Sequence, residues 1–139
     1  MALAQRIMDD IIDLELEKIE KIIAKIDSDP ESEEVKEAEK HLWEKIYKKS
    51  GQGRRTGVGI TAEGDMLAAM GLRYGTEEAT EFSEQVHKTI ALEAYRSSVN
   101  MAKERGAFAI YDSEREKNNP FINRLKEADP ELYEEMKKY

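Results

Sequence analysis

Two histidines are the side chains of this chain best suited to metal chemistry, because imidazole and carboxylate groups together bind transition metals. Glu84 and His87 fit the Glu-x-x-His spacing, which binds metals when two copies face each other inside a helical bundle. His41, the other histidine, has Ala38 at the position where that pattern needs a carboxylate. The second half of a metal site is missing, so we expect both histidines to be solvated or to lie at the edge of a core. A metal-dependent bundle is the weaker alternative.

A second chemical pattern lies between Gly57 and Ala62, which fits G-x-G-x-x-A, a variant of the dinucleotide-binding fingerprint. In that motif, glycines let the backbone approach a pyrophosphate at the start of a helix. The motif requires a preceding buried strand, and the polar, glycine-containing residues 49–55 do not read as one. We therefore predict a tight loop leading into a helix.

The same region carries a basic cluster made of Lys48, Lys49, Arg54 and Arg55. Beside glycines, such a cluster is able to bind a phosphate through backbone N–H groups and guanidinium forks. Nothing else nearby converges on an anion. We favour a structural interpretation, in which cations balance the dipole at the end of the preceding helix.

No set of residues in the chain is complete enough for catalysis. There is no cysteine, which excludes disulfides, thiolate nucleophiles and cysteine metal sites, and no Ser-His-Asp arrangement is identifiable. We therefore assign no catalytic, cofactor-binding or metal-binding residue.

The composition indicates one soluble, acidic unit over residues 1–139. Charged residues make up 37% of the chain and the net charge is -8, so the chain would repel nucleic acids and anionic membranes. No apolar run approaches the roughly 18 residues that read as a membrane span. We expect a cytoplasmic protein with neither nucleic acid nor membrane as a partner.

Apolar residues recur mostly at helical spacing, which predicts a mostly α chain of five to six helices. Pro30, Pro120 and Pro130 each follow an Asp or Asn that can cap a helix. The predicted helices cover residues 2–26, 31–49, 62–70, 77–105, 120–128 and 130–138.

Glycines mark the breaks between these helices. Gly51, Gly53 and Gly57 predict a loop over about 50–57, followed by at most one short strand near 57–61. Thr61 is the expected cap of the next helix, and Gly71 is its expected left-handed stop.

The stretch from Arg54 to Tyr74, followed by Glu77 to Ala79 and the long helix to Phe108, resembles the large catalytic subunit of ribonucleotide reductases. It looks most like the adenosylcobalamin-dependent, class II branch. The similarity extends to Asn119-Pro120-Phe121 and Glu134-Glu135-Met136, and so covers nearly the whole chain, with residues 27–40 less distinctive.

The resemblance implies a parent enzyme built on a ten-stranded α/β barrel. There, a cysteine thiyl radical on a finger loop abstracts a ribose hydrogen, and two further cysteines reduce the sugar of the nucleotide substrate. The matching segment lies after the finger loop and before the turn that holds the substrate phosphate, so none of these motifs maps onto this chain. Val58 to Ile60 would be a barrel strand in the parent.

The resemblance also carries expectations for the chain by itself. The first helix starts at Met1 without a capping residue and the last runs to Tyr139 without a stop, which suggests a fragment. We expect it to be inactive alone, with the remainder of the reductase chain as its partner. Apolar helix faces left uncovered favour a homo-oligomer. The alternative is a stand-alone helical interaction module.

Overall fold

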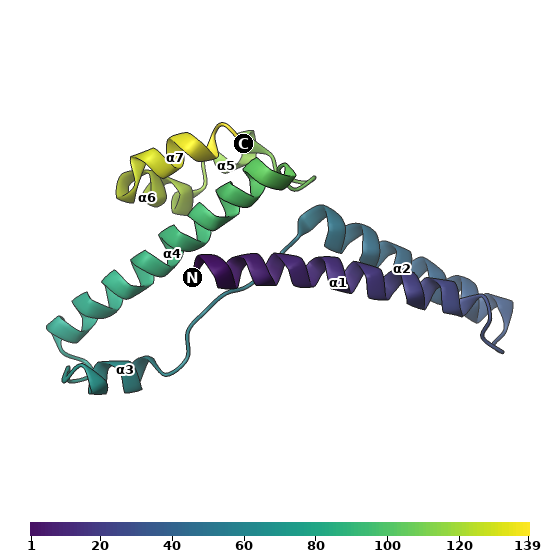
Figure 1. The fold of residues 1–139 in the computed structure, drawn as a ribbon, viewed down its shortest axis with the longest axis horizontal. Helices are drawn as coiled ribbons and strands as arrows, with labels where there is room; N and C mark the ends of the chain where they lie inside the picture. Colours follow the sequence, from purple (N-terminus) through teal and green to yellow (C-terminus); the bar gives the residue numbers. More distant parts are fainter.

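The computed structural model describes residues 1–139 and contains seven helices and no β-strand (Figure 1). The helices are α1 (Ala2–Ile26), α2 (Glu33–Gly53), α3 (Glu63–Ala69), α4 (Glu77–Arg105), α5 (Ser113–Glu116), α6 (Pro120–Ala128) and α7 (Pro130–Met136). The mostly α class is confirmed, and α1, α4 and α6 have the predicted bounds. The unpredicted α5 has four residues, too few to show a helical period, and is capped by the Asp112 carboxylate.

Helix α2 differs from its prediction at both ends. Ser32, rather than Asp29, caps its start, and its hydroxyl accepts a hydrogen bond from the Val35 N–H. The helix then continues through Gly51 and Gly53, where a loop was predicted. A Cβ at Gly51 would lie 3.6 Å from Leu16 of α1, so packing against α1 holds this last turn in place. Tertiary contact here outweighs the cost of glycine in a helix, which is about 1 kcal/mol per residue.

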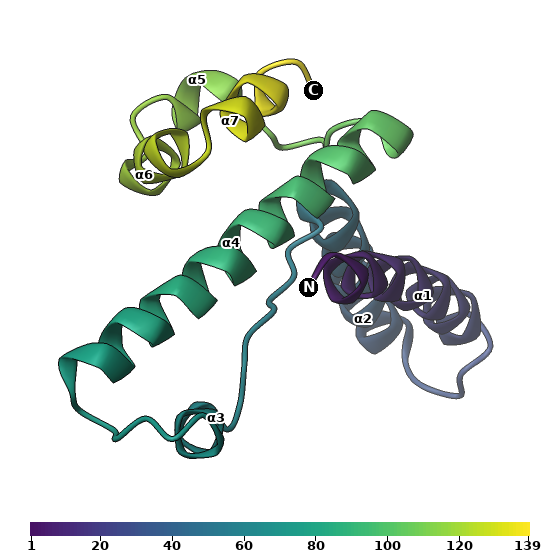
Figure 2. The same ribbon diagram turned by 60° about the vertical axis from the view of Figure 1, so that its left-hand side comes forward.

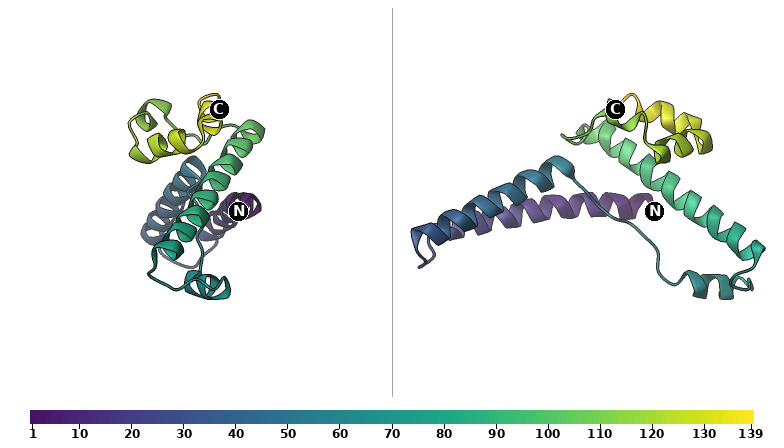
Figure 3. Two further views of the ribbon diagram at one scale, coloured as in Figure 1. Left: turned by 90° about the vertical axis from the view of Figure 1, so that its left-hand side faces the viewer. Right: turned by 180° about the vertical axis from the view of Figure 1, so that it is seen from behind.

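Helices α1 and α2 form an antiparallel hairpin that projects away from the other helices (Figures 1 and 3). Ile19 and Ile26 of α1 are buried in it. The first turns of α1 also cross α4, as Figure 2 shows. None of the helices combines the length and apolar character that a membrane-spanning helix needs.

Between α2 and α3 the chain runs as an extended connection toward the N-terminal end of α4 (Figure 3, right). The predicted short strand is absent, because no other strand lies beside it. Helix α3 is capped by Ala62, with φ 62° and no side-chain hydrogen bond, so the prediction of Thr61 as the cap was wrong. Gly71 does adopt the left-handed conformation that its position predicted, with φ 73°.

We expect Gly71→Ala to destabilise α3 by about 1 kcal/mol, because a Cβ is disfavoured at positive φ. Gly64→Ala is the matched control: Gly64 lies inside α3 with open space around it, so alanine should stabilise the helix by about 0.5–1 kcal/mol. Amide hydrogen exchange in α3 measures both. Equal effects of the two substitutions would show that the left-handed stop contributes nothing.

A buried hydrophobic cluster joins α4 to α6 and α7. Val99, Leu125 and Leu132 form this cluster, and the last two short helices begin at caps made by Asn119 and Asp129, as the sequence predicted. Only 12 of the 139 residues are buried, so most apolar helix faces remain open to other partners.

Candidate functional site

The extended segment, residues 55–61, is the part of the chain with the fewest internal partners. None of the 98 backbone hydrogen bonds involves a backbone N–H or C=O of these seven residues. A side-chain bond ties it to α1, from the Gln5 Nε2 to the Thr56 Oγ1 at 3.0 Å. Free N–H and C=O groups on extended backbone are a template for pairing with another strand.

Several side-chain positions of this region are open to solvent, although Thr56 and Val58 are half-buried. A Cβ added at Gly57 or Gly59 would meet nothing within 4 Å, and Ile60 is exposed. Tyr74, where the family-like stretch ends, is 81% exposed. The extended segment and the residues after α3 therefore offer apolar groups and unpaired backbone together.

The structure gives no support to a dinucleotide site at Gly57 to Ala62. The strand that such a site needs before its glycines is absent, since the preceding residues end α2. Glu63 and Asp65 lie in the first turn of α3 and would repel a pyrophosphate.

The basic cluster of the sequence is divided by the fold. Arg54 turns back onto α1, where its Nε lies 2.7 Å from one carboxylate oxygen of Asp9 and its terminal nitrogen lies 2.8 Å from Asp13. Arg55 remains exposed at the start of the extended segment. Arg54 is therefore committed to ion pairs with α1, a structural role that differs from the predicted balancing of the helix dipole.

Asp9 is the centre of a junction that joins three helices. Its side chain is buried, with the whole residue 8% exposed, and its second carboxylate oxygen accepts from Arg105 at the end of α4, at 2.6 Å. Arg105 also contacts Asp10 at 2.7 Å. We refer to Asp9, Arg54 and Arg105 as the junction cluster.

Two opposing effects act on the pKa of Asp9. Burial raises it, but the hydrogen bonds and positive charges of Arg54 and Arg105 lower it more, so the pKa lies below its ordinary value. The same pairing raises the pKa of Arg54. The cluster is therefore fully charged at neutral pH.

Stability should consequently fall in acid. Because the pKa of Asp9 is lower folded than unfolded, its contribution is complete above the ordinary value of 3.8 and is lost as the pH falls through the lower folded value. We expect the thermal midpoint to drop steeply below about pH 4. The thermal midpoint of Asp9→Asn should drop less over the same range. The remainder comes from Glu104, whose pKa its partner Arg6 lowers, and from Asp129, whose pKa the hydrogen bond from the Leu132 N–H lowers. Identical acid profiles for the two proteins would contradict this role of Asp9.

The fold places His87 beside residues that the sequence pattern did not link to it. Its Nδ1 lies 3.9 Å from Glu63 of α3 and 3.5 Å from the Ser83 hydroxyl, which donates to Glu63. The Ser83 hydroxyl and the Glu63 carboxylate both lie on the Nδ1 side of the His87 ring. A Ser-His-acid relay needs the serine at one ring nitrogen and the acid at the other, so these residues do not form one. No group of three or more His, Cys, Asp or Glu side chains is placed to hold a metal ion.

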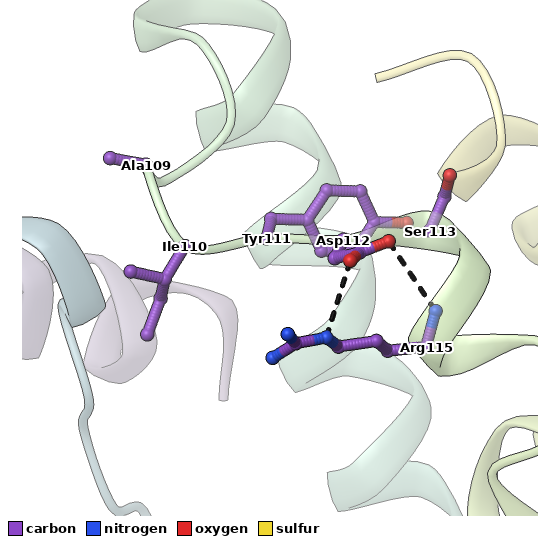
Figure 4. A pocket seen from close by; sticks show the side chains of 6 residues that line it. All are labelled: Ala109, Ile110, Tyr111, Asp112, Ser113 and Arg115. Carbon is purple, nitrogen blue, oxygen red and sulfur yellow. Dashed lines mark hydrogen bonds and ion pairs between the residues drawn. The ribbon is translucent and has the colours of Figure 1, made fainter.

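A surface hollow of about 540 Å³ follows α4 and is lined by residues 109–113 and Arg115 (Figure 4). Two of its polar residues pair with each other: the Asp112 carboxylate accepts from the Arg115 backbone N–H and pairs with the Arg115 side chain at 3.3 Å. The hollow therefore surrounds the cap of α5.

Comparison with known proteins gives a consistent assignment. Residues 2–138 match the family described as "Ribonucleotide reductase, barrel domain". The vitamin B12-dependent ribonucleoside-diphosphate reductase of Thermoplasma acidophilum is 37% identical over 86 residues, which cover 61% of this chain and 11% of that protein. The reductase of the same name from Mycobacterium tuberculosis strain H37Rv is 34% identical over 62 residues, or 45% of this chain and 9% of that protein.

A third relative, the ribonucleoside-diphosphate reductase subunit alpha of Chlamydia pneumoniae, is 38% identical over 58 residues, covering 42% of this chain and 6% of that protein. The chain thus spans about a tenth or less of the length of the curated relatives it matches. No solved structure matches it.

Proposed function

Because this chain belongs to the ribonucleotide reductase barrel-domain family, we propose that it is a segment of the catalytic barrel of an adenosylcobalamin-dependent reductase. The whole enzyme would convert ribonucleotides to deoxyribonucleotides for DNA synthesis. Two of the relatives carry the name vitamin B12-dependent ribonucleoside-diphosphate reductase, which supports this branch of the family. The partner of the chain is then the remainder of the reductase.

The observation that carries this proposal is the extended segment, residues 55–61. Its backbone groups have no internal hydrogen-bond partner, which leaves them available to pair with neighbouring strands. In a barrel, neighbouring strands would supply those partners on both sides. The segment alternates small glycines with Val58 and Ile60, a pattern that allows close approach of other backbone.

The residues of this chain do not fit adenosylcobalamin as a working cofactor. The resemblance implies that cysteine thiols carry the radical and reduce the sugar, and the chain contains no cysteine. The cysteines, the cofactor site and the phosphate turn would come from the remainder of the reductase. We therefore propose that the isolated chain is inactive.

A chimaera tests the proposal. The stretch of the Thermoplasma acidophilum reductase that matches this chain is replaced by the corresponding stretch of the chain, which must include residues 55–61 because it covers 61% of the chain. We expect the chimaera to reduce a ribonucleoside diphosphate in the presence of adenosylcobalamin, and the isolated chain not to.

Paired variants of the chimaera separate strand pairing from side-chain effects. Ile60→Pro removes a backbone N–H and should reduce the activity by at least about tenfold, whereas Ile60→Val keeps the strand and should retain it. A folded but inactive chimaera, or activity of the isolated chain, would refute the proposal.

Self-association is a second proposal, based on the outer face of α1. Leu3, Ile7, Ile11 and Leu14 follow one another at helical spacing and are all exposed. A contiguous apolar stripe favours association, either with the reductase or with a second copy. Light scattering of the isolated chain at micromolar concentration should show a dimer or larger species; a monomer would count against self-association.

A further inference from the structure

Arg54 adopts a backbone conformation that favours glycine. It is the C-cap of α2, with φ 42° and ψ 46°, in the left-handed region. A glycine, Gly53, stands directly before it, yet the arginine takes this position. This conformation is disfavoured for any residue with a Cβ, and the side-chain contacts of Arg54 offset that cost.

Those contacts use three N–H groups of the guanidinium. The Nε donates to an Asp9 carboxylate oxygen at 2.7 Å, one terminal nitrogen donates to the Asp9 backbone carbonyl at 2.9 Å, and the other donates to Asp13 at 2.8 Å. All three acceptors lie on adjacent turns of α1. A planar guanidinium can reach them together, whereas the single ammonium of lysine cannot reproduce this geometry.

The second oxygen of Asp9 binds Arg105. Arg54 immediately precedes the extended segment, and Arg105 ends the long helix that follows it. One buried carboxylate therefore holds both ends of the stretch that contains residues 55–61 and α3.

We propose that Arg54 is a positioning residue, whose clamp on Asp9 and Asp13 fixes the direction in which residues 55–61 leave α2. In the barrel, that direction would align the extended segment with its neighbouring strands. This consequence rests on the proposed function, whereas the direction itself is a property of the 139-residue chain. A merely structural ion pair would stabilise the helices and leave the direction of the segment unchanged.

Spin labels measure the direction in the intact chain. The chain has no cysteine, so Lys45→Cys on α2 and Gly59→Cys in the extended segment are unique labelling sites; both positions are exposed. We expect pulsed electron–electron double resonance to show one narrow distance distribution between the two labels. Arg54→Gly, which suits the backbone but removes the clamp, and Arg54→Lys, which keeps the charge, should both lose the narrow peak while circular dichroism keeps its helical signal.

Arg55→Gly is the matched control, since Arg55 is the exposed neighbour, and it should keep the narrow peak. If Arg54→Gly fails to fold, Asp13→Asn and Arg54→Lys provide the test, because each removes only part of the clamp. An unchanged distribution in the folded Arg54 variants would overturn the proposal. If the Arg54 variants lose the narrow peak and the chimaera is inactive, the positioning role stands and the reductase assignment is refuted. If the chimaera is active and the Arg54 variants keep the narrow peak, the reductase assignment stands and the positioning role is refuted.

Discussion

Replacing Asp9 with alanine is expected to lower the free energy of unfolding by about 2–4 kcal/mol, the largest electrostatic effect in the chain. The substitution leaves Arg54 and Arg105 without their shared buried carboxylate. Partial solvent access to the arginines keeps the loss below the upper end for buried ion pairs, because water replaces part of the interaction. Urea unfolding followed by circular dichroism measures the loss.

Asp13→Ala is the control for this prediction. Asp13 contacts the same arginine, but its side chain is 54% exposed, so the loss should stay below about 1 kcal/mol. Equal losses for the two alanine variants would contradict the central role of Asp9 in the junction cluster.

Leu132→Ala should cost a similar amount, about 2–4 kcal/mol, through a different mechanism. Leu132 is 0% exposed and packs with Val99 and Leu125 at the contact of α4 with α6 and α7. Truncation removes buried methyl groups and leaves a cavity that the short helices can close only in part. The same urea experiment measures the effect, with near-ultraviolet circular dichroism reporting on the tyrosines around the cluster.

Leu42→Ala is the control for the core. Leu42 is on α2, is 54% exposed and has a helix propensity close to that of alanine, so its substitution should cost less than about 0.5 kcal/mol. If Leu132→Ala were as mild as Leu42→Ala, the C-terminal helices would not be docked on α4.

Local patterns in the sequence were sufficient for most of the helices. The long apolar seams of α1 and α4 predict their bounds, and each Asp or Asn followed by proline before α6 and α7 proved to be the observed cap. One error falls where tertiary contacts override local preference, because Gly51 lies against Leu16 of α1 and Gly53 lies against Ile110, and both remain helical. The error at the start of α2 is local, since Ser32 caps the helix in preference to Asp29.

The junction cluster was beyond the reach of sequence patterns. Asp9 lies 45 positions from Arg54 and 96 from Arg105, and no local spacing links residues so far apart. The contact of Glu63 with His87 was missed for the same reason. The extended segment, in contrast, is recognisable from its residue types alone, but its strand does not form here because strand pairing needs partners that this chain does not contain.

The most direct test of the account is hydrogen–deuterium exchange of residues 55–61, measured in the isolated chain and in the Thermoplasma acidophilum chimaera. Without backbone partners, these amides should exchange within seconds in the chain alone, and pairing in the barrel should slow them by at least about 100-fold. Slow exchange in the isolated chain, or equally fast exchange in the folded chimaera, would contradict the claim that this segment is a barrel strand.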